Sequence, residues 1–243
     1  MSPRRLSGCL LAPFLALGSL AANAADKAWQ IDQEDRLGGE RSIYASSRGL
    51  RIESKQSRVT IVSSPPEWKV ATCSDTKKIY CDCPVDKFVN MLSKPIAVVY
   101  GVNLAGIPLK KKGAGTKCGV ATVVYDTPFA LGIKEFWNST PSQDGSHRLP
   151  LNAHAEFVES FKLPDAESSI MSRLLGLPKE PGLPLVFEYR DQDKDLKRYL
   201  KSFSVREISI DDSKFKVPTG YKRVPTVQEV MRAVDNEDVQ NLF

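Results

Sequence analysis

Apolar and polar residues alternate along much of the chain between residues 48 and 81, and this period of two predicts successive antiparallel strands. Pro65-Pro66 and Ser74-Asp75-Thr76 supply turn residues between them. The strands predicted in this stretch cover residues 48–53, 57–62, 67–72 and 78–81. Later segments with strand-like patterns cover residues 96–100, 107–110, 120–125, 131–137, 183–190 and 200–210. We therefore expect a chain of mostly β structure.

Three other segments have apolar residues spaced three and four apart, which predicts amphipathic helices. The first starts near Cys83, and the second covers residues 165–175 and ends before Gly176. The third begins at Thr226, whose hydroxyl forms a capping box with Glu229. The apolar positions are Val85, Phe88, Val89 and Leu92 in the first helix, Ile170, Met171, Leu174 and Leu175 in the second, and Val227, Val230, Met231 and Val234 in the third.

The segments between these elements predict loops and turns. Residues 138–152 are rich in Asn, Ser, Pro, Gly and Asp and are expected to form a surface loop. Phe157, Val158 and Phe161 fit either a brief helix or a strand. Lys110-Lys111-Lys112 precedes Gly113-Ala114-Gly115, which we expect to join two strands. The lysines are therefore expected at a solvated hairpin tip rather than at a phosphate site.

The N-terminus has the three parts of a cleavable secretory signal peptide. Arg4-Arg5 is followed by an apolar run over residues 10–20, which ends in Ala22-Asn23-Ala24. Small residues at the first and third of these positions predict cleavage after Ala24, so that the mature chain begins at Ala25. We therefore expect a soluble or peripherally attached protein of the periplasm or the extracellular space.

Two other interpretations of this region are disfavoured. Leu6-Ser7-Gly8-Cys9 has the residue types of a lipobox, but Cys9 precedes the apolar core that a lipobox must follow. The apolar run is too short to span a bilayer, which takes about 20 apolar residues. No later segment approaches that length, so the mature chain is expected to have no transmembrane segment.

Composition and charge are those of an ordinary globular protein. The chain has 42% hydrophobic and 26% charged residues, which does not predict disorder. The net charge is +5, to which Arg4 and Arg5 contribute two charges, and the remaining Lys and Arg are scattered among Asp and Glu. This weak and dispersed surplus does not favour binding of nucleic acid.

Four cysteines remain in the mature chain, namely Cys73, Cys81, Cys83 and Cys118. An even number in an oxidising compartment predicts two disulfides. A Cys81–Cys83 bond would close a strained ring, so each of these two is expected to reach either Cys73 or Cys118, and both arrangements stay open. Cys81 and Cys83 could instead hold a soft metal ion, but no Met or His cluster lies near them in the sequence.

Candidate catalytic residues are few. The two histidines, His147 and His154, match no metal motif in their spacing, and the chain has no G-x-S-x-G, H-E-x-x-H or P-loop motif. We therefore expect no catalytic residue, no metal and no cofactor, and do not predict an enzyme.

Several short motifs resemble the LolA/LolB-like superfamily of bacterial envelope proteins. They are Gly49-Leu50-Arg51-Ile52-Glu53, the meander leading to Trp68, the lysine-rich turn before Ile79-Tyr80, and a C-terminal segment from Ser213 to Val224 with the pattern Phe-x-Val-Pro-x-Gly-Tyr. The resemblance implies an α+β, mainly β fold in which a curved antiparallel sheet, or half-barrel, wraps around a few short helices. Together with the N-terminal and C-terminal patterns, it divides the chain into a signal peptide (1–24), one β-rich domain (25–224) and a C-terminal helix and tail (225–243).

The resemblance also implies a function. We expect a non-enzymatic binding protein that holds a lipid-like or other hydrophobic ligand in the half-barrel. The residues expected to line the ligand site alternate inward on the predicted strands and are Ile52, Val59, Ile61, Trp68, Val123 and Phe187. The alternative is an envelope protein-protein interaction module with a fully packed core and no small ligand, because residues that line a cavity and residues that fill a core have the same pattern.

Overall fold

A computed structural model describes residues 26–36, 38–91, 109–127, 151–180, 182–190 and 196–232. Several predictions fall outside these ranges and keep the status of predictions. They are the signal peptide, the strands at 96–100 and 131–137, His147, most of the loop at 138–152, and the last helix beyond residue 232.

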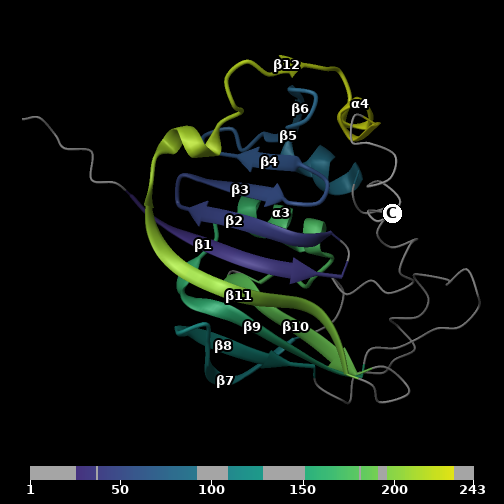
Figure 1. Ribbon diagram of the computed structural model, residues 1–243. Coiled ribbons are helices and arrows are strands. Elements are labelled where there is room, and N and C mark those ends of the chain that lie inside the picture. The colour runs from purple at the N-terminus through teal and green to yellow at the C-terminus, as the bar shows by residue number, and fades with distance from the viewer. Residues whose placement is uncertain are drawn as a thin grey trace, which may run out of the picture.

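The described strands form one large, curved and unclosed sheet, so the fold is α+β and mainly β, as predicted (Figure 1). The sheet has 12 strands in the order β12-β6-β5-β4-β3-β2-β1-β11-β10-β9-β8-β7, and every pair except β12–β6 is antiparallel. The bounds are β1 Asp26–Asp35, β2 Gly39–Ser46, β3 Gly49–Ser54, β4 Val59–Ser63, β5 Val70–Ser74, β6 Ile79–Cys83, β7 Lys110–Lys117, β8 Val120–Asp126, β9 Leu151–Lys162, β10 Gly182–Arg190, β11 Leu196–Ile210 and β12 Lys222–Arg223.

The sequence pattern did not predict β1 and β2. In β1, Trp29 and Ile31 alternate with polar residues, but the next two positions on the same face are Gln33 and Asp35, so the apolar pattern stops halfway. The partner of β1 explains why it is a strand, because all ten of its residues pair with β11, from Asp26 opposite Ile210 to Asp35 opposite Leu200. The first and the last long strands therefore meet in the middle of the sheet.

One predicted turn is wrong. Gly113-Ala114-Gly115 lies inside β7, and the chain reverses at Cys118 and Gly119, whose φ angles are 50° and 81°. Lys110–Lys112 consequently lie along a strand at the edge of the described sheet and not at a hairpin tip. The segment around Phe157, for which helix and strand were both open, is strand β9.

The three predicted helices are present. The first covers residues 85–91, and α3 (Asp165–Leu175) has the predicted bounds, with Gly176 as a left-handed C-cap at φ 62°. In α4 (Val227–Arg232), the backbone N–H of Glu229 donates to Thr226 Oγ1 at 3.3 Å, and that hydroxyl donates to Glu229 Oε1 at 3.1 Å. The Thr226 hydroxyl therefore caps the helix as expected, and the Glu229 side chain accepts from this hydroxyl. A short 3₁₀ helix, η2, covers Asp212–Phe215.

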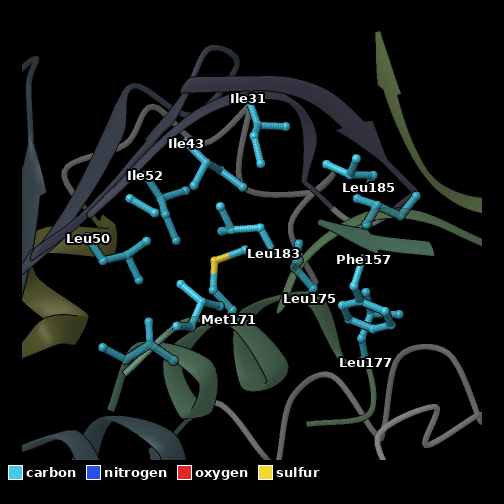
Figure 2. Close-up of a cluster of buried hydrophobic side chains, with 14 of the residues drawn as sticks. Ile31, Ile43, Leu50, Ile52, Phe157, Met171, Leu175, Leu177, Leu183 and Leu185 are labelled. Atoms are coloured by element: carbon cyan, nitrogen blue, oxygen red, sulfur yellow. The ribbon is translucent and has the colours of Figure 1, made fainter. Parts of the chain in front are cut away.

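The main core lies between α3 and one face of the sheet, which we call the inner face (Figure 2). A row of directly paired residues, Ile31, Ile43, Ile52 and Ile61, crosses β1 to β4 on this face. Ile170, Met171 and Leu175 of α3 belong to the same buried cluster. Because side chains alternate along a strand, Val62, Ala71 and Cys73 point to the opposite, outer face, where they form a second cluster.

The C-terminal strap, residues 211–226, lies on the outer face and then follows the edge of the sheet. Phe215 is buried over Gly49, and Tyr221 packs against the second cluster. Strand β12 pairs with β6, and α4 then contacts β5 and β6, with Val230 buried. The strap therefore covers the β6 edge of the sheet. Within the described ranges, no helix has the length and apolar character needed to cross a membrane.

Candidate binding site on the inner face of the sheet

Four of the six predicted lining residues are part of the packed core. Ile52, Val59, Ile61 and Phe187 are each at most 9% exposed and belong to the cluster that includes the α3 side chains. Ile52 and Ile61 are directly paired, so the structure brings them together as predicted. Alternation therefore assigned these four residues to a buried face. On that face they contact other protein side chains, where a ligand had been predicted.

The other two predicted lining residues lie elsewhere. Trp68 precedes β5 in the turn after β4, where its φ angle is 50° and its N–H donates to the carbonyl of Ser64 at 3.1 Å. It is half-buried and belongs to neither hydrophobic cluster. Val123 is also half-buried and pairs with Phe157, which places it on the inner face beyond the packed core. For Trp68, the preceding Pro65-Pro66 was the sequence signal that the turn between β4 and β5 is long.

A small cavity remains beside α3. Its volume is about 10 Å³, enough for about one water molecule. Its lining includes Phe157, Ser168, Met171, Leu177 and Glu180. The hydroxyl of Ser168 donates to the carbonyl of Glu180 at 2.8 Å, which ties the helix to the loop that follows it.

Glu167 is the unusual residue of α3. It lies three and four positions before Ile170 and Met171, on the helix face that packs on the sheet, and it is 0% exposed. Among the described parts of the chain, neither of its carboxylate oxygens has a hydrogen-bond partner. Burial alone raises the pKa of this carboxyl to about 8. The helical pattern did not single out Glu167, because one acidic residue in a first turn is normally solvated.

A polar cluster occupies one end of the inner face. Arg41 of β2 forms a buried ion pair with Asp35 of β1, and Asp35 Oδ1 accepts a hydrogen bond from the N–H of Gly38 at 2.7 Å. Gln33, directly paired with Arg41, accepts a hydrogen bond from Ser202 at 3.3 Å. Burial lowers the pKa of Arg41 to about 10, so the side chain stays charged at neutral pH. These polar residues are why the sequence pattern missed β1.

The predicted disulfides are not confirmed, since the four cysteines are unbonded. Thr72 pairs with Cys81 and Cys73 pairs with Tyr80, so alternation places Cys73 on the outer face and both Cys81 and Cys83 on the inner face. Cys118 lies in the β7–β8 turn, where its sulfur contacts the carbonyl of Ser202 at 3.5 Å. Burial raises the pKa of Cys73 to about 12, and it also raises the pKa values of Cys81 and Cys83.

The one described histidine is held between acidic groups on β8 and β9. His154 Nδ1 lies 2.9 Å from Asp126 Oδ1, and its Nε2 lies 3.6 Å from Glu156 Oε1. Lys112 contacts Asp126 at 2.6 Å. Burial raises the pKa of Asp126, but the hydrogen bonds from Lys112 and His154 outweigh this effect, and the net shift is downward. No group of three His, Cys, Asp or Glu residues suited to a metal ion occurs in the described ranges.

Comparison with known proteins gives distant likenesses. No protein-family model matches the chain, and no curated protein does. An uncharacterized conserved protein from Thermus thermophilus is 13% identical with a TM-score of 0.42, over 84% of this chain and 93% of that one. MucB in complex with MucA(peri) is 11% identical with a TM-score of 0.33, over 83% and 58% of the two chains.

The Pseudomonas aeruginosa MucA/MucB complex gives similar values, with 10% identity, a TM-score of 0.33, and 83% and 59% of the two chains covered. This chain spans about six tenths of the MucB chains that it matches. Membership of the LolA/LolB-like superfamily stays a prediction at this level of similarity.

Proposed function

We propose that this protein is a non-enzymatic binding protein of the bacterial cell envelope that binds a protein partner on its outer surface. The observation that carries the proposal is the filled inner face, where four of the six predicted ligand-lining residues are at most 9% exposed. The cavity beside α3 is about 10 Å³, whereas sites for small molecules are typically about 300–1,000 Å³. Among the described residues, space for an acyl chain beside this cavity would require α3 to move.

The surface that we propose for the partner is the basic end of the sheet, defined as Arg58, Lys77, Lys78 and Lys222. All four are exposed, and hydrogen bonds hold their segments together. The N–H of Asp75 donates to the carbonyl of Arg58 at 3.0 Å, and the N–H of Lys222 donates to the carbonyl of Lys78 at 2.9 Å. The four cations therefore lie on neighbouring segments, namely the β3–β4 turn, the β5–β6 turn and the strap.

These cations are available to an acidic partner. Within the described ranges, Arg58, Lys77 and Lys222 form no ion pair, and Lys78 lies over the ring of Tyr221 at 5.1 Å. The carboxylate of Asp75, the acidic residue among them, already accepts hydrogen bonds from Thr60 at 2.8 Å and Tyr221 at 2.7 Å. Electrostatic complementarity of this kind steers association and selects the partner more than it adds affinity.

Site-specific photo-crosslinking in the host cell tests this surface. A photoreactive residue at position 77 is compared with one at position 111, an exposed lysine of β7. We expect an adduct of defined mass from position 77 and none from position 111. The adduct should be lost when Arg58→Glu and Lys222→Glu are introduced. Equal adducts from both positions, or an adduct that survives the charge reversals, would contradict the proposed surface.

A hydrophobic ligand is the second candidate function, favoured by the uninterrupted row Ile31, Ile43, Ile52 and Ile61 on the inner face. Native mass spectrometry of protein purified from its own envelope fraction separates the two functions. The mass of the polypeptide alone is expected for a partner-binding protein. A stoichiometric lipid that is released by organic solvent would replace our proposal with the ligand-binding function.

A further inference from the structure

We propose that the docking of α3 on the inner face of the sheet is coupled to the uptake of one proton by Glu167. This carboxyl lies on the sheet-facing side of the helix, next to Ile170 and Met171, and it is fully buried. Figure 2 shows Met171 and Leu175 of α3 among the side chains of the sheet. A carboxylate at position 167 has to leave water whenever the helix docks.

Nothing in the described structure compensates a negative charge there. Both oxygens of Glu167 lack a hydrogen-bond partner in the described ranges, and burial is the whole cause of its raised pKa. Pro164, the N-cap residue, has no backbone N–H, so Glu167 cannot complete the capping box that its position would otherwise allow. An isolated buried carboxyl of this kind takes up a proton instead of staying charged.

The elements packed around α3 present few other titrating groups. On the inner face, the row Ile31, Ile43, Ile52 and Ile61 continues through Thr72, which does not titrate, to Cys81. Burial raises the pKa values of Cys81 and Cys83, which keeps both thiols neutral below pH 9. The polar end of the same face contributes the ion pair of Arg41 and Asp35. Phe88 is the buried residue of helix 85–91, and its neighbours Asp86 and Lys87 are exposed.

Asp165, in the first turn of α3, is exposed and forms an ion pair with Lys179. Glu180, in the loop after α3, is the other partly buried carboxyl near the helix among the described residues. Burial raises its pKa, and a hydrogen bond from Tyr125 partly offsets the shift. Because Glu180 has this partner, it serves as the matched control for Glu167.

The direction of the pH effect follows from proton binding. In the undocked helix the carboxyl has its ordinary pKa of 4.5, and in the docked helix it keeps its proton up to a pKa of about 8. The equilibrium constant for docking is therefore largest below pH 4.5. It falls by about tenfold per pH unit from there to about pH 8, because the docked state holds one more proton. Above that pH both states are ionised, and no further weakening is expected. Rising pH would thus uncover the apolar inner face.

Hydrogen exchange measured by mass spectrometry tests the coupling on the full mature chain between about pH 5 and pH 8. Protection of residues 165–175, corrected for the intrinsic exchange rate at each pH, is expected to fall by about tenfold per pH unit in the wild type. In Glu167→Gln, which keeps the shape of the side chain and removes its titration, protection should not change with pH. Glu180→Gln should keep the wild-type slope. Glu167→Leu replaces Glu167→Gln if the latter does not fold.

Three results would overturn the proposal. The first is constant protection of α3 in the wild type across this pH range, and the second is an unchanged slope in Glu167→Gln. The third is a parallel loss of protection in β2 and β3, since the proton would then be linked to unfolding of the whole domain and not to docking of the helix.

Discussion

The two ends of the described sheet are protected from edge-to-edge pairing in different ways. At β6 the chain covers its own edge, because β12 pairs with it and Arg223 contacts Asp82 at 2.6 Å (Figure 1). At β7 the exposed residues include Lys110, Lys111 and Lys112, and the pairing register with β8 shifts after Lys111. Lysines and irregular pairing are known devices against strand addition.

Protection of the β6 edge therefore depends on packing, and protection of the β7 edge depends on charge. The strap is fixed by a buried aromatic ring, hydrogen bonds and ion pairs, so weakening it should cost stability. The lysines of β7 are solvated, so removing them should cost solubility and leave stability almost unchanged. Four variants separate the contribution of packing from that of charge.

Phe215→Ala is expected to have the largest effect. Phe215 anchors the strap on the outer face and is 2% exposed, so its truncation should lower the free energy of unfolding by about 3–5 kcal/mol. Urea unfolding followed by circular dichroism measures this change. The control is Phe203→Ala, because Phe203 is 49% exposed and its loss should change the free energy by less than about 0.5 kcal/mol. Equal effects of the two variants would show that Phe215 is not an anchor.

Gly49→Ala tests the close approach of the strap from the side of the sheet. A Cβ atom at Gly49 would lie 2.7 Å from the Cβ of Phe215 and 2.8 Å from the carbonyl oxygen of Ser63. The φ angle of Gly49 is 155°, which residues with a side chain rarely adopt. Relief of this overlap requires the strap or β3 to shift, so we expect a loss of about 1–3 kcal/mol in the same unfolding assay. At Gly113, where a Cβ would meet no atom within 4 Å, substitution by Ala should be tolerated. A neutral Gly49→Ala would contradict the observed packing.

Tyr221→Phe removes one hydroxyl and keeps the ring of the strap. That hydroxyl donates to Asp75 at 2.7 Å, and burial together with this hydrogen bond raises the pKa of the phenol. We expect a loss of about 1 kcal/mol in the free energy of unfolding. Measured in an Asp75→Asn background, the same substitution should have a smaller effect. The same loss in both backgrounds would mean that the hydroxyl does not act through Asp75.

Replacement of Lys110, Lys111 and Lys112 by Thr should have the smallest effect on stability. These side chains are exposed, so the unfolding midpoint should stay within the error of the assay. The uncharged edge should instead associate at high protein concentration, which sedimentation velocity detects. A triple variant that stays monomeric would show that the bulge protects this edge without the lysines.

The sequence pattern predicted the elements whose periodicity is complete. Helix α3 begins and ends where the spacing of Ile170, Met171 and Leu175 and the following Gly176 place it. Alternation also assigned Ile52 and Ile61 correctly to one buried face. Strands β1 and β2 were missed because their inner positions include buried polar residues, among them Asp35 and Arg41, whose opposite charges compensate each other only when the two strands are paired.

The candidate site was less predictable than the fold. Alternation states which side of a strand is buried, but it does not state whether a ligand or a helix covers that side. The predicted position of Trp68 in a strand was wrong, because the turn between β4 and β5 covers residues 64–69 and not the predicted 63–66, so β5 starts two residues after Trp68. Glu167 could not be singled out, since its burial depends on where the whole helix docks.

Local periodicity and capping were sufficient to predict the mainly β class, the three helices and part of the main core, including Ile52, Ile61 and the apolar residues of α3. Tertiary structure alone decided that β1 joins β11, that the strap covers the β6 edge, that Cys73 faces away from Cys81 and Cys83, and that Glu167 is buried without a partner in the described ranges. The reason is physical: each of these features depends on contacts between residues far apart in the chain, and local residue preferences contain no information about which distant surface a segment will meet.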